Sequence, residues 1–175
     1  MAVPRLVDLK GSRPLVLRAM LRVDIRQLQQ GPVETAGQLE PGDPVLDGLG
    51  LVLAEPVAVA GVLQGTSEGD YLWRGRIRAG VAGECRRCLA PVTQQLDEGL
   101  DVLFSSDPDL VDDPSVYALS PDATSIDVTI AVREELALRL SVFPLCRPDC
   151  QGLCAICGAD LNAGPCLAHG PGTTD

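Results

Sequence analysis

The chain has little with which to build a catalytic site. Its 175 residues include a single histidine, His169, whose position beside cysteines suits a metal ligand better than a Ser-His-Asp set. There is no glycine-rich loop of the kind that cradles phosphates, and no pair of carboxylates in an acid–base context. We therefore expect a protein that is not an enzyme.

The sequence also lacks a hydrophobic run that could cross a membrane. Its most apolar segment, Leu51–Leu63, is interrupted by Glu55 and Pro56, and a spanning helix needs about 20 apolar residues. The first residues, Met1–Arg5, do not begin the apolar core of a signal peptide. These features predict a cytosolic protein, in which cysteines stay reduced.

An excess of positive charge is missing as well. The formal net charge is −10, which argues against nucleic-acid binding through a general electrostatic footprint. The charge is uneven, because Tyr71–Pro91 holds five arginines and one acid while Ser105–Asp127 holds six aspartates and no base. A solvated strand and a solvated linker are the simpler interpretations. Alternatively, the acidic segment could hold a basic protein, and the basic strip could touch RNA through Arg74, Arg76, Arg78, Arg86 and Arg87.

What the chain does have is clustered thiols. Five of the seven cysteines and the only histidine lie between Cys146 and His169, and the other two form the pair Cys85-Arg-Arg-Cys88. Thiols two or three residues apart can face one ion, because a tight turn brings both sulfurs within reach of a tetrahedral centre. The pattern predicts one or two zinc ions. The simplest division gives one site Cys85, Cys88, Cys146 and Cys150, and gives the other Cys154, Cys157, Cys166 and His169.

Two other chemistries fit parts of this pattern. A C-x-x-C dithiol can be redox-active, although the βαβ context of a thioredoxin-like unit is absent. The spacing of Cys150, Cys154 and Cys157 also matches an iron–sulfur motif of radical enzymes, but only 18 residues follow Cys157. Zinc explains more of the ligands. The glycine after Cys157 adds to the zinc interpretation, since it lets backbone amides turn toward sulfur.

Hydrophobic periodicity predicts an α+β fold: a twisted antiparallel β-sheet with one packed helix and a Cys-rich zinc-binding C-terminal segment. We expect residues 1–145 to form the α+β domain with the first C-x-x-C pair, 146–169 the zinc-binding segment and 170–175 a disordered tail. In the strand Tyr71–Val81, alternation places Arg74, Arg76 and Arg78 on one face. The other expected strands are Leu15–Val23, Leu51–Leu63 and Val92–Phe104, the helix is Val128–Ser141, and the loops are Gln30–Gly48 and Ser105–Thr124.

These residues resemble the YceD family, the large ribosomal RNA subunit accumulation proteins. The matching pieces are Leu6–Leu9, Gly83–Leu89, the segment Ile126–Leu136 that includes the start of the expected helix, Cys146–Gly158 and Asp160–Asn162. The resemblance implies a non-enzymatic factor for accumulation or processing of large-subunit ribosomal RNA and for ribosome assembly. Its partner would be a ribosomal RNA precursor or a basic large-subunit ribosomal protein.

The end of the chain departs from that family pattern. Relatives often finish with Cys-x-Cys or His-x-His, whereas this chain has Cys166-Leu-Ala-His169. Some relatives lack the distal thiols, so the resemblance implies that the first site is the structural necessity. A zinc-thiolate redox switch or metal-responsive regulator is the alternative function.

Overall fold

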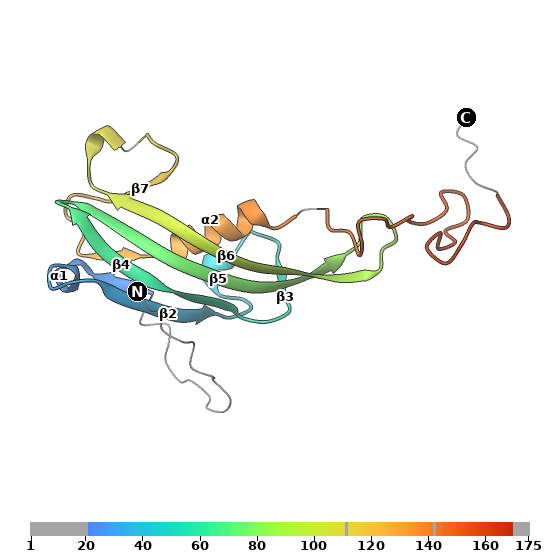
Figure 1. Cartoon of the computed structure of the whole chain (residues 1–175), viewed down its shortest axis with the longest axis horizontal. Coiled ribbons are helices and arrows are strands. Elements are labelled where there is room, and N and C mark those ends of the chain that lie inside the picture. The colour runs from blue at the N-terminus through green and yellow to red at the C-terminus, as the bar shows by residue number, and fades with distance from the viewer. Residues whose placement is uncertain (1–20, 111, 142, 170–175) are drawn as a thin grey trace, which may run out of the picture.

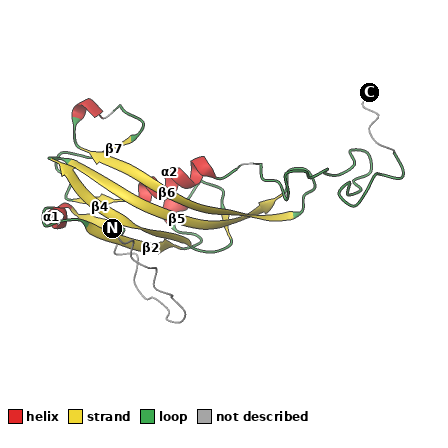
Figure 2. Cartoon of the chain, in the orientation of Figure 1, coloured by secondary structure: helices red, strands yellow, loops and turns green. Residues whose placement is uncertain are grey.

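The chain folds mainly as an open β-sheet with one main helix (Figure 1, Figure 2). The computed structural model describes residues 21–110, 112–141 and 143–169. Its elements in chain order are β1 (Arg22–Asp24), α1 (Ile25–Leu28), β2 (Val33–Leu39), the 3-10 helix η2 (Pro44–Leu46), β3 (Val52–Leu53), β4 (Val57–Ser67), β5 (Asp70–Glu84), β6 (Pro91–Ser105), the 3-10 helix η3 (Pro108–Leu110), β7 (Val116–Ala118), β8 (Ser125–Asp127) and α2 (Thr129–Arg139).

The long strands β5 and β6 carry the sheet. They pair antiparallel from Asp70 opposite Ser105 to Glu84 opposite Pro91, and β4 and β2 add antiparallel on the other side of β5. The order is therefore β2-β4-β5-β6-β7, with β3 paired to β5 and with β1 and β8 forming a separate two-stranded sheet. Because β5 and β6 run past the end of β4, the turn between them projects from the sheet toward the Cys-rich segment (Figure 1).

The two faces of β5 differ as its alternating sequence predicts. Trp73 and Ile77 are fully buried, whereas Arg74, Arg76 and Arg78 are exposed. The buried face packs against helix α2 in one continuous hydrophobic core.

Trp73 is accommodated by glycines on its own strand and on the neighbouring one. A Cβ at Gly75 would lie 2.3 Å from the indole ring, and one at Gly61, the cross-strand partner of Gly75, would lie 2.7 Å from the indole nitrogen. The indole N–H donates to Thr35 Oγ1 at 2.9 Å. Two side-chain-free positions therefore make room for the only tryptophan at the centre of the core.

Helix α2 follows its expected pattern. Asp127 Oδ1 accepts a hydrogen bond from the backbone N–H of Thr129 at 3.0 Å, which satisfies a donor left free at a helix start. Val132 and Leu136 are fully buried against the sheet. On the outer side, Arg139 and Glu135 form an i,i+4 ion pair at 2.6 Å.

Three expectations about strands and loops were wrong. Residues 30–48 are not all loop, because Val33–Leu39 forms β2, in which the polar Thr35 is buried as the acceptor for Trp73. Leu51–Leu63 is not one strand, since the chain leaves β3 before Pro56 and re-enters the sheet in β4. The acidic segment after Ser105 contains β7, and β7 pairs parallel with β6, so the sheet is not purely antiparallel.

Some expectations lie outside the described residues, namely the first part of the strand Leu15–Val23 and the tail 170–175. Within the described residues, none of the helices is long and apolar enough to span a membrane. Residues 143–169 form no helix or strand there beyond an isolated bridge between Leu153 and Asp160 (Figure 2).

Candidate metal centres

The turn that joins β5 to β6 presents the first thiol pair. The backbone N–H of Cys85 donates to Ala90 O at 2.8 Å, and that of Leu89 donates to Cys85 O at 2.9 Å. These two bonds fold Cys85–Cys88 tightly, so both side chains lie at the tip of a rigid hairpin. Leu89 adopts a left-handed backbone with φ of 60°, the only non-glycine residue with positive φ among those described.

The second thiol pair uses the same turn. Cys154 N donates to Ala159 O and Gly158 N donates to Cys154 O, both at 2.8 Å. Gly158 has a φ of 73° and therefore stands where Leu89 stands in the first turn. The glycine after Cys157 predicted this geometry, whereas nothing in Cys85–Leu89 indicated that a leucine would adopt it.

The first cluster joins the β5–β6 turn to the segment after α2. Arg86 N donates to Pro144 O at 2.9 Å, which holds the incoming chain against the turn. Four sulfurs then meet: Cys85 Sγ lies 3.7 Å from Cys150 Sγ, and Cys88 Sγ lies 3.5 Å from Cys146 Sγ. In a tetrahedron with Zn–S bonds of about 2.3 Å, sulfurs lie about 3.8 Å apart. Both distances are close to that edge length, so the four thiols could hold one ion.

The second cluster is more local. Cys157 Sγ lies 3.6 Å from Cys166 Sγ, and His169 Nδ1 lies 3.4 Å from Cys166 Sγ and 3.8 Å from Cys154 Sγ. A tetrahedron with one Zn–N bond and three Zn–S bonds has N···S edges of about 3.6 Å. In each cluster the four donor atoms lie within 4.8 Å of one another, close enough to hold a metal ion. All seven cysteines are free of disulfides.

Electrostatics separates the thiols within each cluster. Burial alone would raise the pKa of Cys85, but backbone N–H groups of Cys146, Cys88 and Arg87 hydrogen-bond to its sulfur and lower that pKa to about 6. The adjacent Cys88 thiol, together with burial, raises the pKa of Cys146 to about 12. Cys85 therefore ionises readily, whereas Cys146 does not ionise beside the other thiols of the cluster. Four thiolates this close to one another need a bound cation to neutralise their charge.

The same holds in the second cluster. Backbone N–H groups of Cys157 and Ile156 lower the pKa of Cys154 to about 6. At Cys157 a hydrogen bond from the backbone N–H of Ala159 lowers the pKa, but contacts with the Cys166 and Cys154 thiols outweigh it, so that the pKa is raised. Both turns thus prepare their first cysteine as a thiolate.

Both clusters lie in the part of the chain that matches a known protein family. Residues 73–175, which contain both clusters, match the family described as "Large ribosomal RNA subunit accumulation protein YceD". The chain belongs to the YceD family. No solved structure matches it.

Curated relatives of this YceD chain come from bacteria and a plant. A Mycobacterium tuberculosis protein named only as uncharacterized is 36% identical over 111 residues, which are 61% of this chain and 52% of the relative. An uncharacterized Mycobacterium leprae protein is 32% identical over 128 residues, 70% of this chain and 58% of the relative. A chloroplastic "Large ribosomal RNA subunit accumulation protein YCED homolog 1" of Zea mays is 24% identical over 118 residues, 50% and 40% of the two chains. The chain spans about half the length of the curated relatives it matches.

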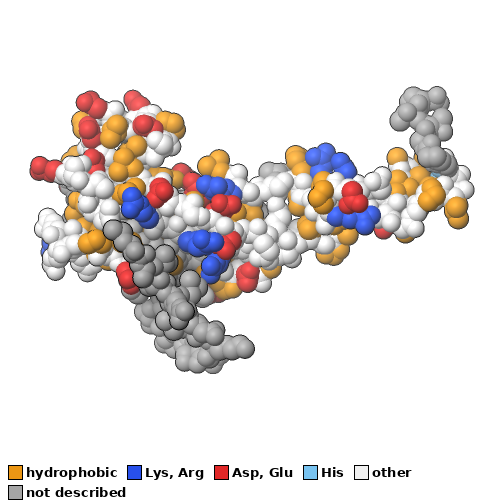
Figure 3. Space-filling model, in the orientation of Figure 1, with side chains coloured by type: hydrophobic (Ala, Val, Ile, Leu, Met, Phe, Trp, Pro, Cys, Tyr) orange, Lys and Arg blue, Asp and Glu red, His pale blue; other side chains and the backbone are white. Residues whose placement is uncertain are grey.

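The three arginines on the exposed face of β5 already form ion pairs with aspartates of β6. Arg76 and Arg78 share Asp97 Oδ1 at 2.5 and 3.2 Å, and Arg74 lies 3.4 Å from Asp101. The register explains this, because Asp97 pairs directly with Arg78 and Asp101 with Arg74 across β5 and β6. On the face shown in Figure 3, basic side chains lie beside acidic ones instead of forming a continuous basic patch.

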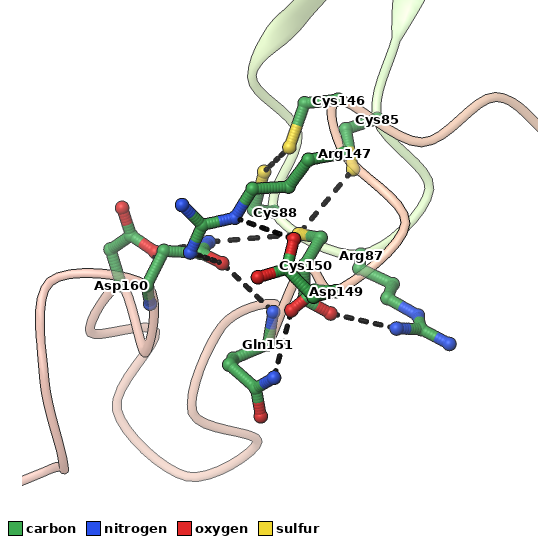
Figure 4. A network of polar contacts seen from close by, with 10 residues as sticks. Cys85, Arg87, Cys88, Cys146, Arg147, Asp149, Cys150, Gln151 and Asp160 are labelled. Carbon is green, nitrogen blue, oxygen red and sulfur yellow. Dashed lines mark hydrogen bonds and ion pairs between the residues drawn. The ribbon is translucent and has the colours of Figure 1, made fainter.

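Arg86 and Arg87 differ from the sheet arginines. Among the described residues, neither forms an ion pair with a carboxylate. Arg86 lies over the ring of Phe143, 5.0 Å from its centroid, and Arg87 donates to Cys150 O at 2.7 Å (Figure 4). The five arginines of the predicted basic strip therefore form two separate groups. The three on the sheet are neutralised by aspartates, and Arg86 and Arg87 lie beside the first cluster.

Proposed function

We propose that this YceD chain is a non-enzymatic zinc-binding factor that supports accumulation or processing of large-subunit ribosomal RNA and assembly of the subunit in the cytoplasm. The observation that supports the proposal best is the pair of four-residue Cys and Cys/His clusters inside the region that matches the family. The nature of the ion is inferred from the donor set.

Zinc is the ion that the donors favour. Thiolates and imidazole select soft or borderline metals over calcium and magnesium, and tetrahedral sets of four thiolates, or of three thiolates and one imidazole, are typical of structural zinc. Each cluster offers four protein ligands, which leaves no open position for a substrate or an activated water. The arrangement supports a structural role for the metal.

The proposed partner is a ribosomal RNA precursor, contacted at the metal-bearing end. Arg86 and Arg87 have no carboxylate partner among the described residues, and Phe143 is exposed over 63% of its surface. Guanidinium groups beside an exposed aromatic ring suit phosphates and unstacked bases of single-stranded RNA. Arg74, Arg76 and Arg78 are weaker candidates, because Asp97 and Asp101 neutralise them.

A basic large-subunit ribosomal protein is the second candidate partner. It is favoured by the net charge of −10 and by the aspartates that follow β6. Two of these aspartates are engaged in local turns: Asp107 accepts from the backbone of Asp109, and Asp113 from the backbone of Ser115. Both side chains are nevertheless exposed at the surface.

The test combines metal analysis with binding. Native mass spectrometry of purified protein should show two zinc ions, and Arg86→Gln with Arg87→Gln should weaken binding of large-subunit RNA precursors. The matched control replaces Arg74, Arg76 and Arg78 by Gln and should weaken it less. If RNA binding is unaffected by either set, and neutralising Asp107, Asp109, Asp112 and Asp113 abolishes binding of a basic ribosomal protein, the RNA assignment is wrong.

A zinc-thiolate redox switch is the alternative, and one distance favours it. Cys88 and Cys146 hold their sulfurs 3.5 Å apart, and Cys146 is exposed. An oxidant such as hydrogen peroxide could then convert the two thiolates to a disulfide, with reduction of the peroxide and release of the ion. Rapid zinc loss in mild peroxide together with a change in partner binding would support the switch, while resistance to peroxide would support the assembly factor.

A further inference from the structure

Asn162 belongs to one metal cluster by sequence and to the other by contact. It lies in the loop between Cys157 and Cys166, both members of the second cluster. Its side-chain Nδ2 lies 3.6 Å from the sulfur of Cys150 in the first cluster. A loop whose two ends carry ligands of the second cluster therefore reaches a ligand sulfur of the first cluster. Asn162 is also the only asparagine in the chain.

Its hydrogen bonds fix the orientation of the amide. Asn162 Oδ1 accepts from the backbone N–H of Gln151 at 2.8 Å and from the Arg147 guanidinium at 3.0 Å, and both partners can only donate. The NH2 group must then face the other way, toward Cys150 Sγ and toward Asp160 Oδ1 at 2.7 Å. Figure 4 shows Arg147, Gln151 and Asp160 grouped around Cys150.

The backbone around Asn162, from Gly152 to Leu161, is also held against the turn that carries Cys85 and Cys88. Leu153 N donates to Arg87 O at 3.1 Å, and Leu161 N donates to Gly152 O at 2.9 Å. Gly152 has a φ of 76°, and a Cβ there would lie 2.9 Å from Arg87 O. Only a glycine permits this approach, so the contact between the segment and the first turn is close and specific.

Cys150 is the residue for which such a donor matters. It is fully buried, at 0% exposure, so its sulfur has little access to water. An N–H donor to a buried ligating sulfur stabilises the charged form and orients the ligand. Loss of a donor of this kind costs roughly 10- to 100-fold in metal affinity at well-studied sites.

We propose that Asn162 couples the two centres: metal at the second cluster orders the loop that presents Asn162 to Cys150, and so slows metal loss from the first. The inference rests on the proposed metal binding. Coupling of equilibrium affinities is reciprocal, so whatever factor the second metal adds to the affinity of the first cluster, metal at the first cluster should add to the affinity of the second.

The two sites can be observed separately in the full chain loaded with cadmium-113. The all-thiolate environment of the first cluster and the mixed thiolate–imidazole environment of the second give distinct NMR resonances. After addition of excess chelator, decay of the all-thiolate resonance reports metal release from the first cluster. We compare wild type, Asn162→Ala, His169→Ala and the double variant, with Ala163→Ser as a control in the same loop. The indole N–H signal of Trp73 checks that the sheet is intact in every variant.

Asn162→Ala and His169→Ala should each speed release from the first cluster by roughly tenfold, and Ala163→Ser should not. The double variant should release no faster than either single variant, since both changes break one link. Unchanged release in Asn162→Ala with both resonances present would overturn the coupling alone. A multiplicative effect in the double variant would also overturn it. A wild-type chain that binds no cadmium would overturn the metal proposal and the coupling together.

Discussion

Leu89 and Gly158 occupy the same position in two copies of one turn, with φ of 60° and 73°. In each copy the residue's N–H donates to the carbonyl of the first cysteine, at 2.9 and 2.8 Å. Glycine adopts this backbone freely, whereas the same conformation costs a leucine roughly 1–2 kcal/mol. Leu89 is also 59% exposed, so burial of its side chain offsets little of that strain.

Exchanging these residues should have opposite effects on the two sites. Gly158→Leu should weaken cadmium binding at the second cluster by about tenfold, because strain in a metal-organised turn is subtracted from binding free energy. Leu89→Gly should leave the first cluster as tight or up to severalfold tighter, since relief of strain exceeds the extra chain entropy of glycine. Chelator competition on the two resolved cadmium resonances measures both, and equal affinities in Gly158→Leu and wild type would contradict the shared-turn interpretation.

Gly75→Ala should destabilise the sheet far more than Gly99→Ala. A Cβ at Gly75 would lie 2.3 Å from the Trp73 ring, whereas a Cβ at Gly99 would meet nothing within 4 Å. Overpacking of this kind costs about 1–3 kcal/mol, while the open position should change the free energy of unfolding by less than about 0.5 kcal/mol. Urea unfolding followed by Trp73 fluorescence measures both, and a similar loss in the two variants would rule out the packing explanation.

The metal clusters could be predicted from sequence because their information is local. Spacing alone places Cys154 and Cys157 in one turn, and few partners remain for Cys85 and Cys88. The structure brings both predicted sets together, while metal binding itself remains a prediction. Helix α2 was equally accessible, since its hydrophobic period and the Asp127 side chain that accepts from Thr129 at its start lie within a few residues.

The features that the sequence did not predict depend on which residues pair across the sheet or meet only in the folded chain. The exposure of Arg76 and Arg78 was predictable from alternation, but their neutralisation by Asp97 needs the β5–β6 register. Strand β2 was missed because Gln30–Gly48 is rich in glycine, proline and acids, and the buried role of Thr35 emerges only with its bond to Trp73. The contact of Asn162 with Cys150 had no signal in sequence, because the two residues meet only after the second turn docks on the first.

In the metal-free chain, Cys154 should be alkylated before Cys146 near pH 7, although Cys146 is the more exposed. The pKa of Cys154 is lowered to about 6 and that of Cys146 is raised to about 12, and only the thiolate reacts. From pH 7 to 9 the rate at Cys154 should stay nearly constant, while the rate at Cys146 should rise about tenfold per pH unit. Peptide mass spectrometry after short iodoacetamide pulses measures both rates. Faster labelling of Cys146 would show that exposure, not ionisation, controls these thiols.

Removing a thiol from the first cluster should destabilise the whole domain, whereas removing His169 should not. The first cluster joins the β5–β6 turn to the segment after α2, and 57 residues separate Cys88 from Cys146, so the metal closes a long loop through the sheet and helix. The second cluster spans only Cys154 to His169. Apparent binding free energies of structural zinc are on the order of 10 kcal/mol, and this energy is folding free energy.

In urea unfolding followed by Trp73 fluorescence, Cys85→Ser should lose several kcal/mol of that stabilisation, while His169→Ala should lose at most about 1.4 kcal/mol, the equivalent of a tenfold coupling. Zinc-free wild type is the matched control and should resemble Cys85→Ser. Unfolding of Cys85→Ser that matched zinc-loaded wild type would show that the sheet is stable without its metal clip.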